Sequence, residues 1–240
     1  MSVSRDGGLS RGPGALVRVF ACAAVATTFV AACPSRAAAP APETIAFCDR
    51  AWPLATTILH CYRGWKTSDV PMDLEPLRRL TQLTELRLES GELEFILDLP
   101  IRDLAPLSAL KELKVLSLEH ATLGVGSGVG DVSALASLTW LERLKLHAST
   151  VRDASPLAKL VRLEDLDLSA TGVSDIASLA ALVRLKRLDL TRTRVRDVRP
   201  LAALIHLESL GLSPGAVDAA QLEALQRALP ALRIFEGPTY

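Results

Sequence analysis

Aromatic residues are scarce in this sequence, at 4% of its 240 residues, although hydrophobic residues make up 49%. A core built around large rings is therefore excluded, and the core must consist of leucine, valine and alanine. An excess of charge of either sign is also lacking, because 27 lysines and arginines balance 27 aspartates and glutamates. We expect no nucleic-acid partner, since a neutral chain has no basic field that attracts phosphates.

Patterns that would indicate ligand chemistry are weak. The glycine-rich run at 124–130 is not followed by the Lys-Ser or Lys-Thr pair of a phosphate-binding loop. The four histidines stand at positions 60, 120, 147 and 206, which do not share one place in the repeat described below, so periodicity does not gather them around a metal. We expect no enzyme activity, no cofactor and no metal site. Zinc binding by His60 and Cys61 stays open only if Cys61 forms no disulfide.

An internal repeat of 22 residues organises the chain. The stretch from Val161 to Leu168 recurs as Val183 to Leu190, and both copies follow the pattern L-x-x-L-x-L-x-x-T-x-V-x-D-x-x-x-L-x-x-L. This period and this leucine spacing resemble a leucine-rich repeat, in which each unit contributes one short parallel strand and a return segment. Stacked units share one ladder of leucines, which suits the shortage of aromatic residues.

The leucines that open successive strands predict seven units. They fall at Leu83, Leu113, Leu141, Leu163, Leu185, Leu207 and Leu229. The two early units carry insertions, one within 91–100 and one in the glycine-rich run at 124–130. Both insertions follow a strand, so we expect them to project from one edge of the solenoid. Residues 218–228 have helical spacing, which is typical of a C-terminal cap.

Residues from about Asp73 to Phe235 resemble the bacterial leucine-rich repeat proteins of the internalin-like, 22-residue class. The resemblance implies an α/β solenoid whose curved parallel β-sheet forms the concave face, with short helices, 3₁₀ turns and loops on the convex face. It also implies protein recognition without catalysis. The sequence departs from that class by lacking the asparagines that usually follow each strand, and by the start described next. Binding of a host receptor therefore does not carry over.

The N-terminus has the pattern of an export signal. Arginines precede an apolar run from Val19 to Ala32 that is too short to span a bilayer, and Cys33 follows directly. This junction resembles a bacterial lipobox, so we expect residues 1–32 to be removed and Cys33 to carry a lipid that anchors the chain to a membrane. The protein would then lie on the periplasmic or outer side of the cell envelope. The alternative is ordinary cleavage near Ala37, which would leave a secreted protein.

Cysteine usage is consistent with that start. Cys22 leaves with the signal and Cys33 takes the lipid, so Cys48 and Cys61 remain as one pair. In an oxidising envelope we expect this pair to form a disulfide. No free thiol would then remain.

Four segments are expected after the signal. Residues 33–43 are rich in proline and alanine and predict an extended tether. Residues 44–70 have an irregular pattern that predicts an N-terminal cap holding the disulfide. The repeat domain covers residues 71–235, and residues 236–240 form a short tail.

Stacking places equivalent residues of successive repeats in columns about 4.8 Å apart. One column precedes the return segments and consists of Asp73, Asp103, Asp131, Asp153, Asp175 and Asp197. We expect these carboxylates to cap the orphan N–H groups of the return segments rather than to bind calcium. A second column follows the strands, and its hydroxyls at Ser149, Thr171 and Thr193 are expected to bond neighbouring backbone.

The solvent-facing residues of the central strands alternate in charge. They are Arg143, Lys145, His147, Asp165, Asp167, Arg187 and Asp189. Arg143 is expected beside Asp165, Asp165 beside Arg187, and Lys145 beside Asp167. Two interpretations stay open: cross-strand charge pairs that keep the sheet soluble, or a polar surface that docks another protein.

Trp140 stands one residue before a strand leucine and places a large ring at the edge of the sheet. Exposed tryptophan next to arginine is typical of binding hot spots. Packing under the glycine-rich insertion, or stacking on Arg162, would instead give the ring a structural role. We expect Trp140 and the two insertions to share one edge.

These features predict a monomeric, non-catalytic protein of the cell envelope that binds a protein partner of unknown identity. The predicted binding surface is the concave sheet together with the edge at Trp140. The alternative is a structural or scaffolding envelope lipoprotein whose concave face has no specific ligand.

Overall fold

The computed structural model describes residues 43–63, 72–90, 99–101, 103–119, 121–123 and 130–237. These residues belong to one compact unit, Ala41–Tyr240. The predicted signal peptide, Cys33, the tether up to Pro42 and most of both insertions lie outside the described residues. In the described part of the chain, no helix has the length and apolar character needed to cross a membrane.

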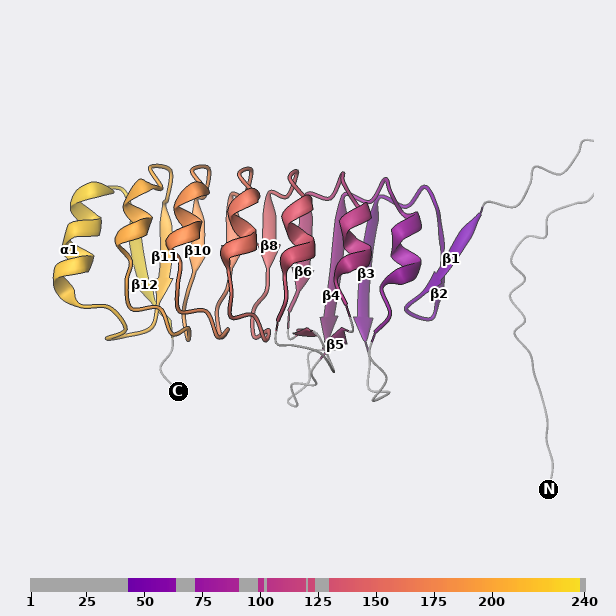
Figure 1. Cartoon of the computed structure of the whole chain (residues 1–240), viewed down its shortest axis with the longest axis horizontal. Helices are drawn as coiled ribbons and strands as arrows, with labels where there is room; N and C mark the ends of the chain where they lie inside the picture. The colour runs from indigo at the N-terminus through magenta and orange to yellow at the C-terminus, as the bar shows by residue number, and fades with distance from the viewer. Residues whose placement is uncertain are drawn as a thin grey trace, which may run out of the picture. The chain divides into compact units, whose positions relative to one another are not determined.

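A parallel β-sheet of eight strands forms one face of the solenoid (Figure 1). Its strands are β3 (Ile58–Arg63), β4 (Glu85–Ser90), β6 (Val115–Leu118), β8 (Arg143–Lys145), β9 (Asp165–Asp167), β10 (Arg187–Asp189), β11 (Ser209–Leu212) and β12 (Arg233–Glu236). They pair in this order, and every pair is parallel. The α/β leucine-rich repeat solenoid expected from the sequence is therefore confirmed.

Short 3₁₀ helices line the opposite face (Figure 1). They are η1 (Glu75–Arg79), η2 (Ala105–Ala109), η3 (Ser133–Ser137), η4 (Ser155–Lys159), η5 (Ala177–Ala181) and η6 (Arg199–Ala203). Each has five residues, which suits the tighter 3₁₀ geometry in short pieces. The repeats stay in register because each helix contacts the next one.

The core between these two faces is a ladder of leucines. In the repeat that opens at Leu163, the strand leucines Leu166 and Leu168 and the return leucines Leu179 and Leu182 are at most 2% exposed. Equivalent leucines are buried in the neighbouring repeats, so each layer rests on the next. Burial of one leucine side chain stabilises the fold by about 1.5–3 kcal/mol, and the ladder repeats this contribution in every layer.

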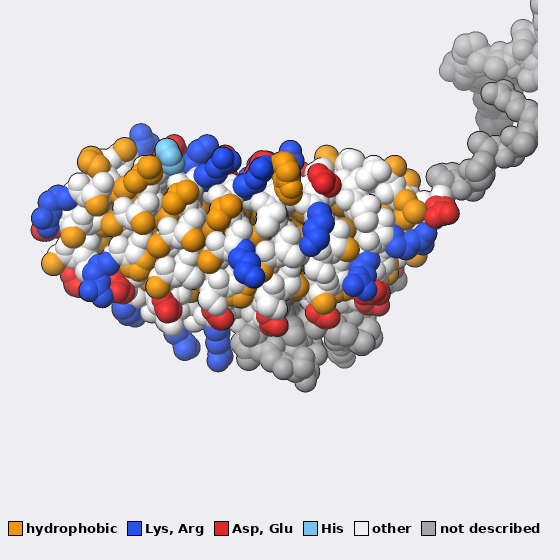
Figure 2. All heavy atoms as spheres, turned by 45° about the horizontal axis from the view of Figure 1, so that its top comes forward, with side chains coloured by type: hydrophobic (Ala, Val, Ile, Leu, Met, Phe, Trp, Pro, Cys, Tyr) orange, Lys and Arg blue, Asp and Glu red, His pale blue; other side chains and the backbone are white. Residues whose placement is uncertain are grey.

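The aspartate column caps the 3₁₀ helices, as predicted. Each carboxylate accepts a hydrogen bond from the backbone N–H two residues later, at 2.7–3.0 Å. The aspartate stands one residue before the position that flanks the helix, so it holds the first helical N–H. In Figure 2 acidic side chains recur along the lower border of the helical face, where these helices begin.

The hydroxyl column bonds neighbouring backbone, as predicted, at two of its three positions. Thr171 and Thr193 donate from Oγ1 to the carbonyl oxygen three residues earlier, at 2.6 and 2.7 Å. These bonds stay inside one repeat, so they do not link neighbouring repeats. Ser149 Oγ is buried and forms no hydrogen bond with any described residue.

The N-terminal cap contains more regular structure than its sequence suggested. A hairpin of β1 (Thr44–Phe47) and β2 (Arg50–Pro53) is followed by β3, which adds an unexpected strand to the main sheet. The predicted disulfide joins Cys48 and Cys61, whose Cα atoms are 6.2 Å apart. Ile45, Phe47 and Leu59 belong to the same buried core as the repeats. The cap thereby closes the open end of the ladder.

The C-terminal end corrects the predicted position of the last strand. Residues Ala219–Ala228 form a regular α-helix, α1, whose first turn is capped by Asp218 through the N–H of Gln221. This ten-residue helix replaces the five-residue 3₁₀ helix of the other repeats. The register pairs Ser209 with Arg233, so β12 follows 24 residues after β11 and Leu229 does not open it. Leu229 instead packs in the core, 6% exposed.

The cap at Asp197 gives a testable pH dependence. Hydrogen bonds from the Arg199 side chain and the Arg199 backbone N–H lower the pKa of Asp197 from 3.8 to about 2. A lowered folded-state pKa stabilises the fold above the unfolded pKa, and this contribution is lost as the pH falls through the folded value. We expect Asp197→Ala to melt below wild type at pH 7, with the difference shrinking between about pH 4 and pH 2. Circular dichroism melts of both proteins check this, and a difference independent of pH would contradict it.

Candidate functional site

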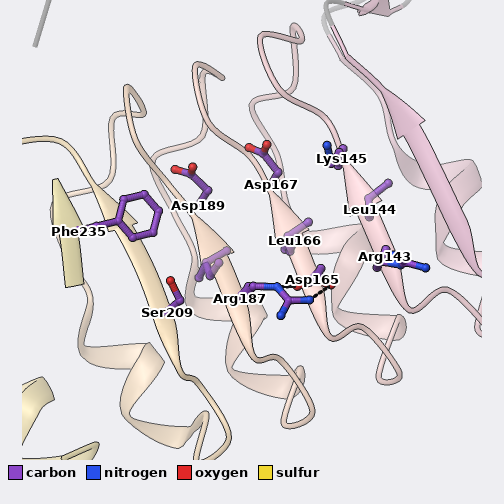
Figure 3. A pocket seen from close by; sticks show the side chains of 11 residues that line it. Arg143, Leu144, Lys145, Asp165, Leu166, Asp167, Arg187, Asp189, Ser209 and Phe235 are labelled. Carbon is purple, nitrogen blue, oxygen red and sulfur yellow. Dashed lines mark hydrogen bonds and ion pairs between the residues drawn. The ribbon is translucent and has the colours of Figure 1, made fainter. Parts of the chain in front are cut away.

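A hollow of about 370 Å³ lies on the concave face over strands β8 to β12. Its lining comprises Arg143, Leu144, Lys145, Asp165, Leu166, Asp167, Arg187, Leu188, Asp189, Ser209 and Phe235 (Figure 3). Six of the seven residues predicted on the concave sheet therefore line this hollow. His147 lies two residues beyond Lys145, past the end of β8, and is not part of the lining.

The first column of the hollow runs through Arg143, Asp165, Arg187 and Ser209. Arg187 forms an ion pair with Asp165 across β10 and β9, drawn as dashes in Figure 3. Because Asp165 pairs with Arg187, Arg143 is left exposed and has no hydrogen bond or ion pair to any described residue. The predicted adjacency of these side chains holds, and one of the two flanking guanidinium groups stays unpaired.

The second column runs through Lys145, Asp167, Asp189, Gly211 and Phe235. Lys145 lies beside Asp167 as predicted, but its Nζ bonds Glu119 Oε1 at 3.0 Å instead. Asp167 and Asp189 therefore face each other on neighbouring strands, and in the described chain neither forms an ion pair. Like charges opposed across strands are unfavourable by themselves, so this pair needs another explanation.

Backbone N–H groups hold both carboxylates in place. Asp167 Oδ1 accepts from the N–H of Ser169 at 2.9 Å, and Asp189 Oδ1 accepts from the N–H of Thr191 at 2.8 Å. Their Oδ2 atoms bond no described residue and remain available. The sheet thus presents two fixed carboxylate oxygens side by side.

Phe235 lines the hollow although it was not among the residues predicted to form the binding surface. Its side chain is 44% exposed although it is large and apolar. The ring lies over Gly211, where an added Cβ would stand 2.6 Å from the ring and 2.6 Å from Asp189 Oδ1. The missing side chain at Gly211 therefore makes room for the ring. The two-residue shift of the last strand hid this relation from the 22-residue register.

A serine, a histidine and an aspartate meet beside the hollow, but not in the order of a catalytic triad. Ser169 Oγ bonds Asp167 Oδ1 at 2.5 Å and His147 Nδ1 at 2.7 Å. The hydroxyl proton lies toward the carboxylate, whereas a nucleophilic serine gives its proton to histidine. Ser169 is also buried. The three groups therefore fix the end of β9 rather than activate a nucleophile.

The stretch Gly211-Leu212-Ser213-Pro214-Gly215 carries the letters of the nucleophile motif G-x-S-x-G. The motif places its serine on a sharp turn directly between a strand and a helix. Here Ser213 Oγ accepts a hydrogen bond from the N–H of Arg192 at 2.6 Å, and α1 begins only at Ala219. The serine thus joins two repeats. Among the residues that the structure describes, no three His, Cys, Asp or Glu side chains are grouped to hold a metal ion.

Trp140 lies in the turn before β8 and is 42% exposed. The guanidinium carbon of Arg162 is 3.7 Å from the centre of its ring, so the stacking alternative is the one observed. The expected common edge with the insertions is wrong. Trp140 precedes β8, whereas β5 (Leu99–Ile101) and β7 (Ala121–Leu123), which adjoin the insertions in the sequence, follow β4 and β6 along the chain. In Figure 1 β5 lies beyond the lower ends of the strands of the main sheet.

The edge at Trp140 carries an apolar column that the sequence analysis did not identify. Val161, Val183 and Ile205 occupy the same repeat position and are large, exposed hydrophobic residues. Their spacing of 22 residues is visible in the sequence. The predicted hot spot at Trp140 therefore stands at the end of an apolar edge rather than in the hollow.

Polar groups at the N-terminal end of the sheet satisfy one another. Glu85 Oε1 accepts from His60 Nε2 at 2.8 Å and from Arg87 Nε at 2.7 Å. The hydrogen bond with His60 and that with Arg87 lower the pKa of Glu85, so the carboxylate stays charged. Among the described residues that line the hollow, Arg143, Asp167 and Asp189 form no ion pair, and Arg233 on β12 is likewise exposed without one.

The close approach at Gly211 predicts the effect of a small substitution. Gly211→Ala places a Cβ where the Phe235 ring and Asp189 Oδ1 now lie, so both side-chain ends must move. Because both are ends of rotatable side chains, we expect the unfolding free energy to change by no more than about 1 kcal/mol. Aromatic NMR signals of Phe235 are expected to shift clearly. An unchanged Phe235 spectrum would contradict the packing described here.

No protein-family model matches the chain, and no curated protein sequence matches it. Solved structures do. An internalin of Listeria monocytogenes has a TM-score of 0.60 and 28% identity, over 78% of this chain and 50% of the internalin. Internalin C2 of the same species has a TM-score of 0.60 and 27% identity, over 77% of this chain and 74% of its own.

A leucine-rich repeat protein of Leptospira interrogans has a TM-score of 0.53 and 20% identity, over 67% of this chain and 45% of its own, and shows the shared fold alone. The chain spans about half the length of the first internalin. The repeats, the parallel sheet and these likenesses show that the chain forms a leucine-rich repeat solenoid similar to those of the two internalins.

Proposed function

We propose that this protein binds another protein through its concave face, and that it does so without catalysis. The observation that carries the proposal is the hollow over β8 to β12, which combines an exposed aromatic ring with charges that have no partner in the described chain. Interfaces typically use an aromatic anchor with a surrounding polar rim. Phe235 supplies the anchor, and Arg143, Asp167 and Asp189 supply the rim.

The concave face is also well suited to recognition by its rigidity. The lining residues stand on strands of one sheet, and backbone N–H groups hold Asp167 and Asp189. A surface that is already ordered loses little conformational entropy on binding. The internalin-like fold supports the same function, since leucine-rich repeats offer extended concave surfaces.

The alternative function is a structural spacer in which the concave charges only keep the sheet soluble. The pairs Arg187–Asp165 and Lys145–Glu119 favour that interpretation, because they are satisfied within the chain. Asp167 and Asp189 oppose it, since like charges on adjacent strands destabilise a sheet, whereas alternating charges would keep it soluble without that cost. Charge reversal distinguishes the two functions.

We also propose that the protein acts in the cell envelope as a monomer, anchored by a lipid on Cys33. This proposal rests on the sequence, namely the apolar run that ends at Ala32 and the cysteine that follows it. Cys33 lies outside the described residues. The disulfide between Cys48 and Cys61 supports an oxidising compartment.

Cross-linking in intact source cells tests the recognition proposal. The test variant carries Arg143→Glu and Asp167→Lys, which reverse two unpaired charges of the hollow without changing net charge. The matched control carries Lys159→Glu and Glu223→Lys on the helical face, where both residues are exposed. We expect wild type and control to capture one protein that the test variant loses. The purified captured protein should bind the test variant at least about tenfold more weakly than it binds wild type.

Equal capture by all three proteins, with the test variant folded by circular dichroism, would contradict binding through the concave face. The spacer function would then be the better account. Capture lost from the control as well would show that the helical face contributes to the contact.

The lipid anchor is tested by the intact mass of the mature protein extracted from source membranes. We expect a chain that begins at Cys33 and carries the mass of a diacylglycerol and acyl groups. The Cys33→Ser variant should keep its fold and lack the added lipid mass, because serine has no thiol to accept the lipid. A mature chain with a free Cys33 thiol, or one that begins after Ala37, would refute the anchor.

A further inference from the structure

We infer that the hollow receives a basic side chain of the partner, an arginine or a lysine, between Asp167, Asp189 and Phe235. This inference rests on the proposed function and specifies the chemistry of the partner. In Figure 3 the two carboxylates project side by side from β9 and β10, and the Phe235 ring stands at the end of their row. Two adjacent carboxylates beside an aromatic ring favour a cation as the bound group.

The lining of the hollow contains three basic and three acidic residues, so the support for a cationic occupant comes from which of these charges pair with one another. Around the hollow, Arg187 is matched by Asp165 and Lys145 by Glu119. Asp167 and Asp189 keep one unbonded oxygen each among the described residues, on adjacent strands of a parallel pair. A partner cation would remove the repulsion between them and gain two charge-assisted hydrogen bonds.

The carboxylates are held in position before any partner arrives. Each Oδ1 accepts a backbone N–H, and Asp167 Oδ1 also bonds Ser169 Oγ. These bonds set the direction of the free Oδ2 atoms. A guanidinium group fits two acceptors in fixed positions better than a flexible amine, so arginine is the better occupant.

Phe235 supplies the apolar wall for the stem and the flat face of such a side chain. The ring and Asp189 Oδ1 both lie 2.6 Å from the point where a Gly211 Cβ would stand, so ring and carboxylate adjoin. A cation close to an aromatic face gains a further attraction.

Arg143 gives the β8 end of the hollow a positive charge, in contrast to the two carboxylates near Phe235. It is exposed and unpaired in the described chain, two strands away from Asp189. An acidic group of the partner is therefore expected about two strand spacings, roughly 10 Å, from the basic side chain. A partner segment with a basic and an acidic residue at that distance matches both ends.

NMR titration of the full chain with short peptides tests the inference. The probe is acetyl-Gly-Arg-Gly-amide, and its matched control contains citrulline, which has the same shape without the charge. We expect the arginine peptide to shift the signals of Asp189, Gly211 and Phe235. Citrulline should bind at least about tenfold more weakly, because it loses the charge-assisted bonds. Acetyl-Gly-Lys-Gly-amide should fall between the two.

Substitutions locate the binding. Asp167→Asn and Asp189→Asn keep an oxygen that can accept the backbone N–H, so both variants should fold. Each should weaken the arginine peptide by about tenfold, whereas Glu223→Gln on α1 removes the same charge and should leave binding unchanged.

Three outcomes would overturn the inference. The first is equal binding of the arginine and citrulline peptides, and the second is binding that the Asp167→Asn and Asp189→Asn variants leave intact. The third is saturable binding of calcium chloride at these signals without peptide binding, which would make the carboxylates a metal site. If the peptides fail while charge reversal in the hollow still abolishes capture of the partner, the recognition function stands and only the basic side chain is refuted.

Discussion

The stacking of buried leucines is the interaction on which the rest of this structure depends. Each 22-residue unit is too small to bury its own apolar side chains, so it is stable only between neighbours that extend the same ladder. The first and last repeats each lack a neighbour on one side, so the apolar side chains at both ends of the ladder must be covered by other elements. The N-terminal end is closed by a disulfide-bonded hairpin and β3, and the C-terminal end by α1 and β12.

The same stacking turns sequence periodicity into surface geometry. Because the leucines fix the register, residues 22 positions apart face one another across strands, and Asp167 must lie beside Asp189. Evolution of a binding surface on such a scaffold needs only changes at outward positions. The concave hollow arises where this column meets Gly211, which has no side chain, and Phe235, which fills the space above it.

The architecture, the capping aspartates and the concave columns could be predicted because they depend on local periodicity. Which charges pair could not, since adjacency allows Asp165 either arginine neighbour, and Lys145 reaches Glu119 instead of Asp167. Phe235 was missed because a ten-residue α-helix lengthens the last unit by two residues. The predicted common edge of Trp140 and the insertions was wrong because Trp140 comes before its strand in the sequence, whereas each insertion comes after a strand.

Site-specific photo-cross-linking tests the central claim that the concave hollow contacts a partner. A photoreactive phenylalanine analogue would replace Ser209, which lines the hollow, or Ala202, which is exposed on η6 of the helical face. Both positions belong to neighbouring elements, so expression and folding are closely matched. The account predicts a discrete cross-linked protein in source cells from position 209 and none from position 202. A cross-link from 202 alone would contradict it.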